Sequence, residues 1–169
     1  PTIRPEECLA HADVVCLGDA EETVVELIGR MNLGQDYSDV EGIWFKKDGE
    51  IVENKLRPLL ENLDTLPLQD FDYKTHFLVV DGVVRRLDAD LLGEMMNYDY
   101  LTQPNRGCPF KCSFCCNNPQ FEMYEKDYKP PSFRERSIDN IIKELVIIKE
   151  TMPFLDHIKF DDDVFFFLS

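Results

Sequence analysis

The strongest constraint on the fold is a strand–helix–strand pattern in the second half of the chain. Residues 98–103 and 157–160 are each typical of a strand. Between them, Ser137 can cap a helix that runs to about Lys149. The apolar residues of that helix fall on one face: Ile138, Ile141, Ile142, Leu145 and Ile148. A helix of this length between two strands predicts a βαβ unit with parallel strands, and therefore an α/β fold.

The N-terminal part predicts a smaller α/β unit. Residues 13–17 have the composition of a short buried strand, and Gly18 to Glu22 form an acidic turn into a helix. The apolar positions of this helix follow a helical period: Val24, Val25, Leu27, Ile28 and Met31. A hairpin follows over residues 42–53, because Asp48-Gly49 supplies the positive φ that a tight turn requires.

The middle of the chain is predicted to hold less regular structure. Residues 57–75 form an extended linker, since their prolines disfavour helix and sheet. Residues 88–96 predict a short helix. The polar segment 122–136, which contains Pro130-Pro131, is predicted to be irregular.

Length and charge exclude some classes of protein. The 169 residues suffice for one domain or for parts of two. A net charge of −15 repels phosphate backbones and excludes a non-specific nucleic-acid binder. No apolar run approaches the ~20 residues of a membrane span. The longest one, Val164–Leu168, has only the length of a strand.

Cysteine spacing is the feature that points to chemistry. Cys108, Cys112 and Cys115 form a C-x3-C-x2-C motif of soft thiolate ligands, suited to zinc or iron–sulfur sites. Structural zinc needs a fourth protein ligand. His157 is a conceivable one, whereas Cys116 adjoins Cys115 and is predicted to be a spare buried thiol. Cys8 and Cys16 are predicted to be small buried side chains.

The motif and its flanks resemble the radical S-adenosylmethionine (SAM) superfamily, in particular its cobalamin-dependent branch. The segments that carry the resemblance are Pro5-Glu6-Glu7, Ala12-Asp13-Val14-Val15, Gly18-Asp19-Ala20-Glu21, Leu63-Asp64-x-Leu66-Pro67, Arg106-Gly107-Cys108-Pro109 with Phe114 before the third cysteine, Arg134-x-Arg136-Ser137 and Phe160-x-Asp162-Asp163-x-Phe165. One departure is Gly18-Asp19, where the branch usually has Gly-Glu.

The resemblance implies a domain organisation. Residues 1–35 correspond to the C-terminal edge of a cobalamin-binding, Rossmann-like α/β domain. Residues 36–96 form the hairpin and linker. Residues 97–169 form the opening βα units of an incomplete radical SAM barrel of the TIM type. We therefore expect the chain to be a central fragment of a longer protein and catalytically incomplete by itself.

The resemblance also implies roles for individual residues. Cys108, Cys112 and Cys115 would hold a 4Fe–4S cluster that cleaves SAM reductively to a 5′-deoxyadenosyl radical. Phe114 would pack by the adenine, with ordinary loop core as the lesser alternative. Asp162, Asp163 and Arg106 would bind the cofactors, or else be a solvated strand end and a surface charge.

The reaction and the partners are further expectations from the same resemblance. Cobalamin-dependent methyl transfer to an unactivated atom is expected, and the alternative enzyme is one for radical ring formation or rearrangement. A non-catalytic iron–sulfur or zinc module is an alternative of another class, as is a dithiol redox protein that uses Cys112 and Cys115. The expected partners are a small-molecule or lipid-like substrate and an electron donor such as flavodoxin or ferredoxin. An oxygen-sensitive cluster favours the cytoplasm.

Overall fold

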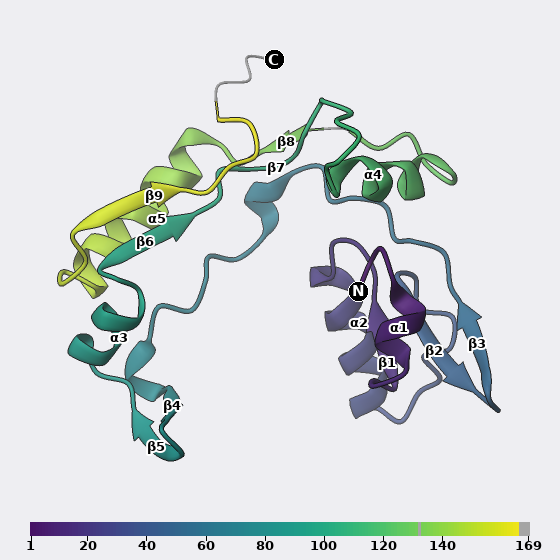
Figure 1. Ribbon diagram of the computed structural model, residues 1–169, viewed down its shortest axis with the longest axis horizontal. Helices are drawn as coiled ribbons and strands as arrows, with labels where there is room; N and C mark the ends of the chain where they lie inside the picture. The colour runs from purple at the N-terminus through teal and green to yellow at the C-terminus, as the bar shows by residue number, and fades with distance from the viewer. Residues whose placement is uncertain (132, 166–169) are drawn as a thin grey trace. The chain divides into compact units, whose positions relative to one another are not determined.

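A computed structural model describes residues 1–131 and 133–165 (Figure 1). The described chain divides into two compact units. The first unit contains residues 1–61 and 108–131, and the second contains residues 62–107 and 133–165. The domain limits expected after residues 35 and 96 stay predictions. Residues 166–168 of the apolar run Val164–Leu168 lie outside the described residues.

The first unit is built on a three-stranded antiparallel sheet with the order β1-β2-β3. Its elements are α1 (Pro5–Leu9), β1 (Val14–Cys16), α2 (Glu21–Asn32), β2 (Ile43–Lys47), β3 (Glu50–Glu53) and α4 (Asn117–Glu125). The predicted hairpin is confirmed: Asp48 and Gly49 have φ values of 53° and 88° between β2 and β3. The predicted strand and helix before it are confirmed as β1 and α2.

Alternation along the strands gives this sheet two apolar faces. Val15 of β1 packs with Leu9 of α1 and Tyr124 of α4. On the opposite face, Ile43 and Phe45 of β2 pack with Leu27 of α2. Each aliphatic side chain buried in this way contributes about 1.5–3 kcal/mol to stability. The segment around residue 124 therefore completes a core that the N-terminal residues begin. Leu27 is the one predicted apolar position of α2 in this core.

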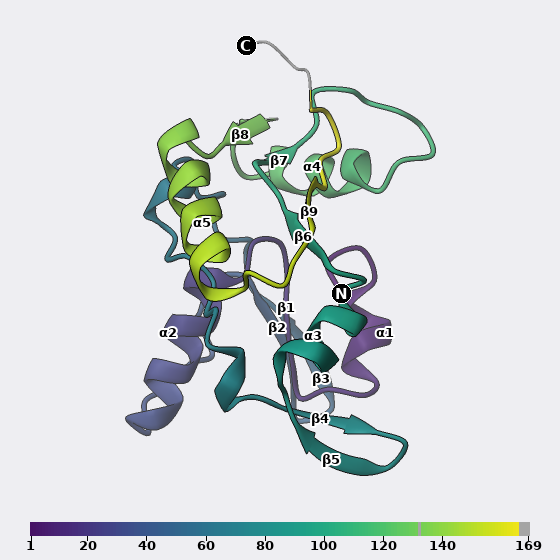
Figure 2. The same ribbon diagram turned by 90° about the vertical axis from the view of Figure 1, so that its left-hand side faces the viewer.

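The second unit contains the predicted βαβ arrangement. β6 (Asp99–Thr102) and β9 (His157–Phe160) pair in parallel, and α5 (Ile138–Thr151) connects them. α5 covers one face of this pair, where Tyr100, Ile148 and Met152 form a core (Figures 1 and 2). The unit also contains η1 (Leu63–Thr65), η2 (Tyr73–Thr75), β4 (Phe77–Val80), β5 (Val83–Arg86), α3 (Ala89–Met95), β7 (Asn105–Gly107) and β8 (Phe133–Glu135).

The linker fixes the start of α5. Ser137 caps the helix as predicted, because its Oγ accepts a hydrogen bond from the Asn140 N–H at 3.1 Å. The Ser137 N–H in turn donates to Asp64 Oδ1 in the linker at 2.9 Å. Hydrogen bonding with the Ser137 side chain, and with its N–H, holds the pKa of Asp64 below its usual range. Two motifs that lie far apart in the sequence therefore meet at one helix end.

Two segments differ from the sequence-based expectation. The segment 122–136 is not irregular throughout: α4 extends to Glu125, and β8 pairs with β7. The prediction failed because tertiary contacts of Tyr124 and strand pairing supply order that the polar composition does not show. The β4–β5 hairpin turns at Asp81-Gly82 and was not predicted, although this pair is a turn signal. Within the described residues, no helix has the length and apolar character needed to span a membrane.

Candidate metal centre

The cysteine motif lies on the loop between β7 and α4. Gly107 ends β7 with a φ of 89°, a left-handed conformation that favours glycine, and Cys108 follows directly. The Cys115 N–H donates to the Cys112 carbonyl at 3.1 Å, which closes a turn between the second and third cysteines. α4 then begins at Asn117. The three cysteines therefore lie on one short loop, which begins at the end of β7 and ends at the start of α4.

All six cysteines are free thiols in the described chain. Cys108 and Cys115 are half-buried, and Cys112 is exposed. Cys116 is also exposed at the surface start of α4, so the prediction of a buried spare thiol was wrong. Cys8 and Cys16 are half-buried, and burial raises the pKa of the Cys16 thiol, in keeping with a small interior side chain.

The donor set fits an iron–sulfur cluster by its chemistry. Three thiolates on one loop offer soft ligands that leave one iron of a cubane open. Among residues 1–131 and 133–165, no three Cys, His, Asp or Glu side chains are gathered closely enough to hold a metal ion. A cluster would therefore bind by drawing Cys108, Cys112 and Cys115 together on their loop. The assignment of these three residues stays a prediction.

Phe114 lies between these ligands and is 91% exposed. The alternative that it packs in a loop core is therefore wrong. An exposed aromatic ring next to a cysteine ligand offers a flat apolar face for a planar ligand such as adenine. The predicted adenine contact itself stays a prediction.

The other predicted cofactor-binding residues belong to the second unit. Asp162 follows β9 and is half-buried. Its carboxylate accepts hydrogen bonds from the Asn105 side chain and from the Val164 N–H, the latter at 2.8 Å. Asp162 is therefore a held carboxylate at a strand end rather than a freely solvated one. Asp163 is exposed, and Arg106 is half-buried in β7.

A buried ionic network in the second unit was not predicted. The side chain of Glu144, on α5, is only 3% exposed. It accepts hydrogen bonds from Tyr100 at 2.7 Å and from Thr102 at 2.6 Å, and it pairs with Arg136. Burial acts to raise the pKa of Glu144, but these three donors outweigh it and lower the pKa. Burial and the adjacent carboxylate raise the pKa of Tyr100.

The sequence carried a signal for this network. Glu144 falls at helical spacing between Ile141 and Ile148, within the apolar face of α5. A charged residue at such a position needs buried partners. The network joins α5 to β6 and to the segment after β8.

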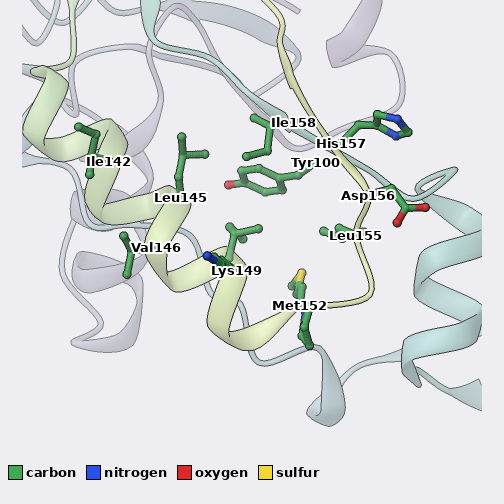
Figure 3. A pocket seen from close by; sticks show the side chains of 12 residues that line it. Tyr100, Ile142, Leu145, Val146, Lys149, Met152, Leu155, Asp156, His157 and Ile158 are labelled. Atoms are coloured by element: carbon green, nitrogen blue, oxygen red, sulfur yellow. The ribbon is translucent and has the colours of Figure 1, made fainter.

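An apolar groove of about 570 Å3 lies beside the same helix. The ring of Tyr100 points into it from β6, and Leu145 and Met152 line it from the side of α5 (Figure 3). The side chains of Asp156 and His157 point away from the ring (Figure 3). Because polar groups do not converge on this groove, it does not provide the contacts that a charged cofactor requires.

Comparison with known proteins gives relatives by sequence. No family model matches the chain. An uncharacterized methyltransferase of Pyrococcus horikoshii is 28% identical over 165 residues, which cover 98% of this chain and 31% of the relative. The anaerobic magnesium-protoporphyrin IX monomethyl ester cyclase of Synechocystis sp. is 27% identical over 110 residues, which cover 61% of this chain and 18% of the relative.

Solved structures share the fold. The cobalamin-dependent SAM radical enzyme OxsB matches 100% of this chain and 20% of its own, with a TM-score of 0.61 and 21% identity. The chain thus shares the fold of a segment of OxsB. The radical SAM methyltransferase TsrM from Kitasatospora setae also matches, over 89% of this chain and 25% of its own, with a TM-score of 0.56 and 16% identity.

The chain matches only a part of each of these proteins. The chain spans about a third of the Pyrococcus methyltransferase and a fifth of OxsB. At these identities the structural likeness to OxsB and TsrM shows the fold and not the activity. One TsrM structure contains cobalamin and a 4Fe–4S cluster, and one OxsB structure contains aqua-cobalamin and SAM.

Proposed function

We propose that this chain is the part of a radical SAM enzyme that holds a 4Fe–4S cluster through Cys108, Cys112 and Cys115. The observation that carries the proposal is the C-x3-C-x2-C loop, set between a strand end and a helix start in a fold shared with OxsB and TsrM. When bound, such a cluster supplies the electron that cleaves SAM to a 5′-deoxyadenosyl radical. The activity is proposed for the protein as a whole.

The chain's own residues would bind and orient the cofactors. The three thiolates would bind iron, and a backbone hydrogen bond closes the turn between Cys112 and Cys115. The exposed ring of Phe114 packs against the adenine of SAM. Asp162, held by Asn105, presents an oriented carboxylate at the end of β9, where parallel α/β folds place their ligands. Asp163 and Arg106, the sequence neighbours of Asp162 and Asn105, are proposed as further cofactor-binding residues.

Methyl transfer to an unactivated atom, with cobalamin as the second cofactor, is the reaction we propose. The support is the methyltransferase assignment of the Pyrococcus relative and of TsrM, together with the cobalamin dependence of OxsB. Residues 1–35 would contribute the edge of the cobalamin-binding domain. Radical ring formation is the second candidate, and the Synechocystis cyclase favours it.

The proposed chemistry also defines partners and a compartment. A small-molecule or lipid-like substrate would be the acceptor of the methyl group. A low-potential electron donor such as flavodoxin or ferredoxin would reduce the cluster. Because a reduced cluster is sensitive to oxygen, the reducing cytoplasm is the proposed location.

Anaerobic reconstitution with iron and sulfide tests the cluster assignment. We expect the unmodified chain to take up about four irons, and Cys108→Ala, Cys112→Ala and Cys115→Ala each to abolish assembly. Cys116→Ala is the matched control, because it removes an exposed thiol of the same loop that is not among the proposed ligands. Iron loading of Cys108→Ala equal to that of the unmodified chain would defeat the assignment. Zinc in anaerobically purified protein would favour the non-catalytic module instead.

A further inference from the structure

The cysteine loop contacts α4, the helix that follows it. α4 begins two residues after Cys115. Lys111, from the middle of the loop, lies with its Nζ 3.6 Å from Glu125 Oε2 and 5.7 Å from the ring centroid of Phe121. Lys111 therefore contacts the middle and the last turn of α4, in addition to the covalent connection that follows Cys115.

The far end of α4 is anchored in the core of the first unit. Tyr124 is 3% exposed and packs with Leu9 and Val15. Its hydroxyl accepts a hydrogen bond from the Asp19 N–H at 3.2 Å. A Cβ on Gly18 would lie 1.6 Å from the Tyr124 oxygen, so this approach requires glycine at position 18. Tyr124 therefore fits against the turn that ends β1.

α4 is a link between these two attachments. A helix of nine residues spans about 13 Å and is marginal in isolation, so its order depends on tertiary contacts at both ends. A metal group bound at Cys115 would also stabilise the first turn of α4. The buried packing of Tyr124 stabilises the last turn of the same helix. Two sites that stabilise one element are thermodynamically coupled, and the coupling acts equally in both directions.

We propose that Tyr124 is a positioning residue that couples metal occupancy of the cysteine loop to the order of the Gly18–Asp19 turn. The inference rests on the proposed function, because it requires the loop to hold a metal group. It goes beyond that function by connecting the cluster loop with residues 1–35, the segment proposed to edge the cobalamin-binding domain. Binding at Cys108, Cys112 and Cys115 then protects the Asp19 amide from exchange.

Hydrogen–deuterium exchange measured anaerobically by mass spectrometry tests this coupling on the full chain. We expect reconstitution with iron and sulfide to slow exchange in a peptide spanning residues 17–23 by about tenfold. In Tyr124→Phe the iron content should be unchanged, and the ratio of exchange rates without and with the cluster should fall to about one. Tyr128→Phe is the matched control: its hydroxyl donates to the Leu56 carbonyl at 2.6 Å rather than bonding to the turn, so the ratio should stay near tenfold.

Two further exchange measurements, on Lys111→Met and on the zinc-loaded chain, test the inference separately from the proposed function. Lys111→Met leaves the core of the first unit intact and should lower the ratio from the loop side. Zinc alone can replace the cluster as the ordering ligand if iron does not assemble. Iron loading without slower exchange at residues 17–23 would overturn the inference and leave the proposed function standing. Failure of both iron and zinc to bind the unmodified chain would overturn both.

Discussion

Replacing Glu144 by alanine should strongly destabilise the second unit. The substitution removes the acceptor for Tyr100 and Thr102 and leaves the Arg136 guanidinium, whose side chain is only 14% exposed, without its carboxylate. Removing one partner of a buried ion pair costs about 3–5 kcal/mol, because the remaining charge stays desolvated. This exceeds the effect of an ordinary exposed substitution, which is about 0.5 kcal/mol or less.

Urea denaturation followed by far-UV circular dichroism measures this change. With a denaturant dependence of about 2 kcal/mol per molar urea, the midpoint of the second unit should fall by about 1.5 M or more. Trp44, the single tryptophan, lies in β2, so its fluorescence reports separately on the first unit. Glu150→Ala, an exposed change on the same helix, is the control. A midpoint for Glu144→Ala equal to that of the control would refute the reasoning.

The pH dependence of stability tests the Glu144 network with Glu144→Gln, a substitution that leaves no cavity. The hydrogen bonds lower the pKa of Glu144 in the folded chain below its unfolded value. The carboxylate therefore adds stability that is fully present above the unfolded pKa of about 4.3 and is lost as the pH falls through the folded pKa. Glu144→Gln should lack this acid-dependent component, and an identical loss of stability in both proteins below about pH 4.3 would contradict the assignment.

Three other changes give sharp outcomes. Gly18→Ala should lower the unfolding free energy by about 1–3 kcal/mol more than Gly34→Ala. Both glycines have positive φ, but only a Cβ at position 18 would meet the Tyr124 side chain. Equal losses of stability in thermal unfolding would contradict this reasoning. Ser137→Ala should cost about 1 kcal/mol by removing the cap of α5, and an unchanged urea midpoint would exclude that role. Asn105→Ala should weaken SAM binding to the reconstituted protein at unchanged iron content, since Asp162 loses its side-chain donor and keeps only the Val164 N–H. Calorimetric titration measures the affinity.

The regular parts of the fold could be predicted because local pattern and tertiary structure agree in them. The helix capped by Ser137 and the strands on either side of it were predicted from apolar periodicity, and their parallel pairing followed from the connection between them. The turn at Asp48-Gly49 was predictable because its backbone conformation demands these residue types.

The remaining parts depend on contacts between distant residues. The position of α4 depends on Tyr124, whose partners Leu9, Val15 and Asp19 lie more than a hundred residues away in the chain. Its sequence has little apolar periodicity of its own, and the segment was therefore predicted to be irregular. Similarly, the hydrogen bond between Asp64 and Ser137 cannot be inferred from either motif alone.

In the candidate site, too, some features follow from the local sequence and others depend on contacts between distant residues. Spacing alone identified the three cysteines as candidate ligands, because soft ligands at short intervals have few other uses. Spacing could not show that Phe114 is exposed or that Asn105 holds Asp162, since both depend on how the loop and the strand ends are folded.

Electron paramagnetic resonance of the dithionite-reduced, anaerobically reconstituted protein, recorded with and without SAM, tests the central claim most directly. The proposed function predicts a 4Fe–4S signal whose g-values shift when SAM is added, because the iron without a protein ligand is open to SAM. A 4Fe–4S signal that does not respond to SAM, or a colourless protein that retains zinc instead of iron, would contradict the account.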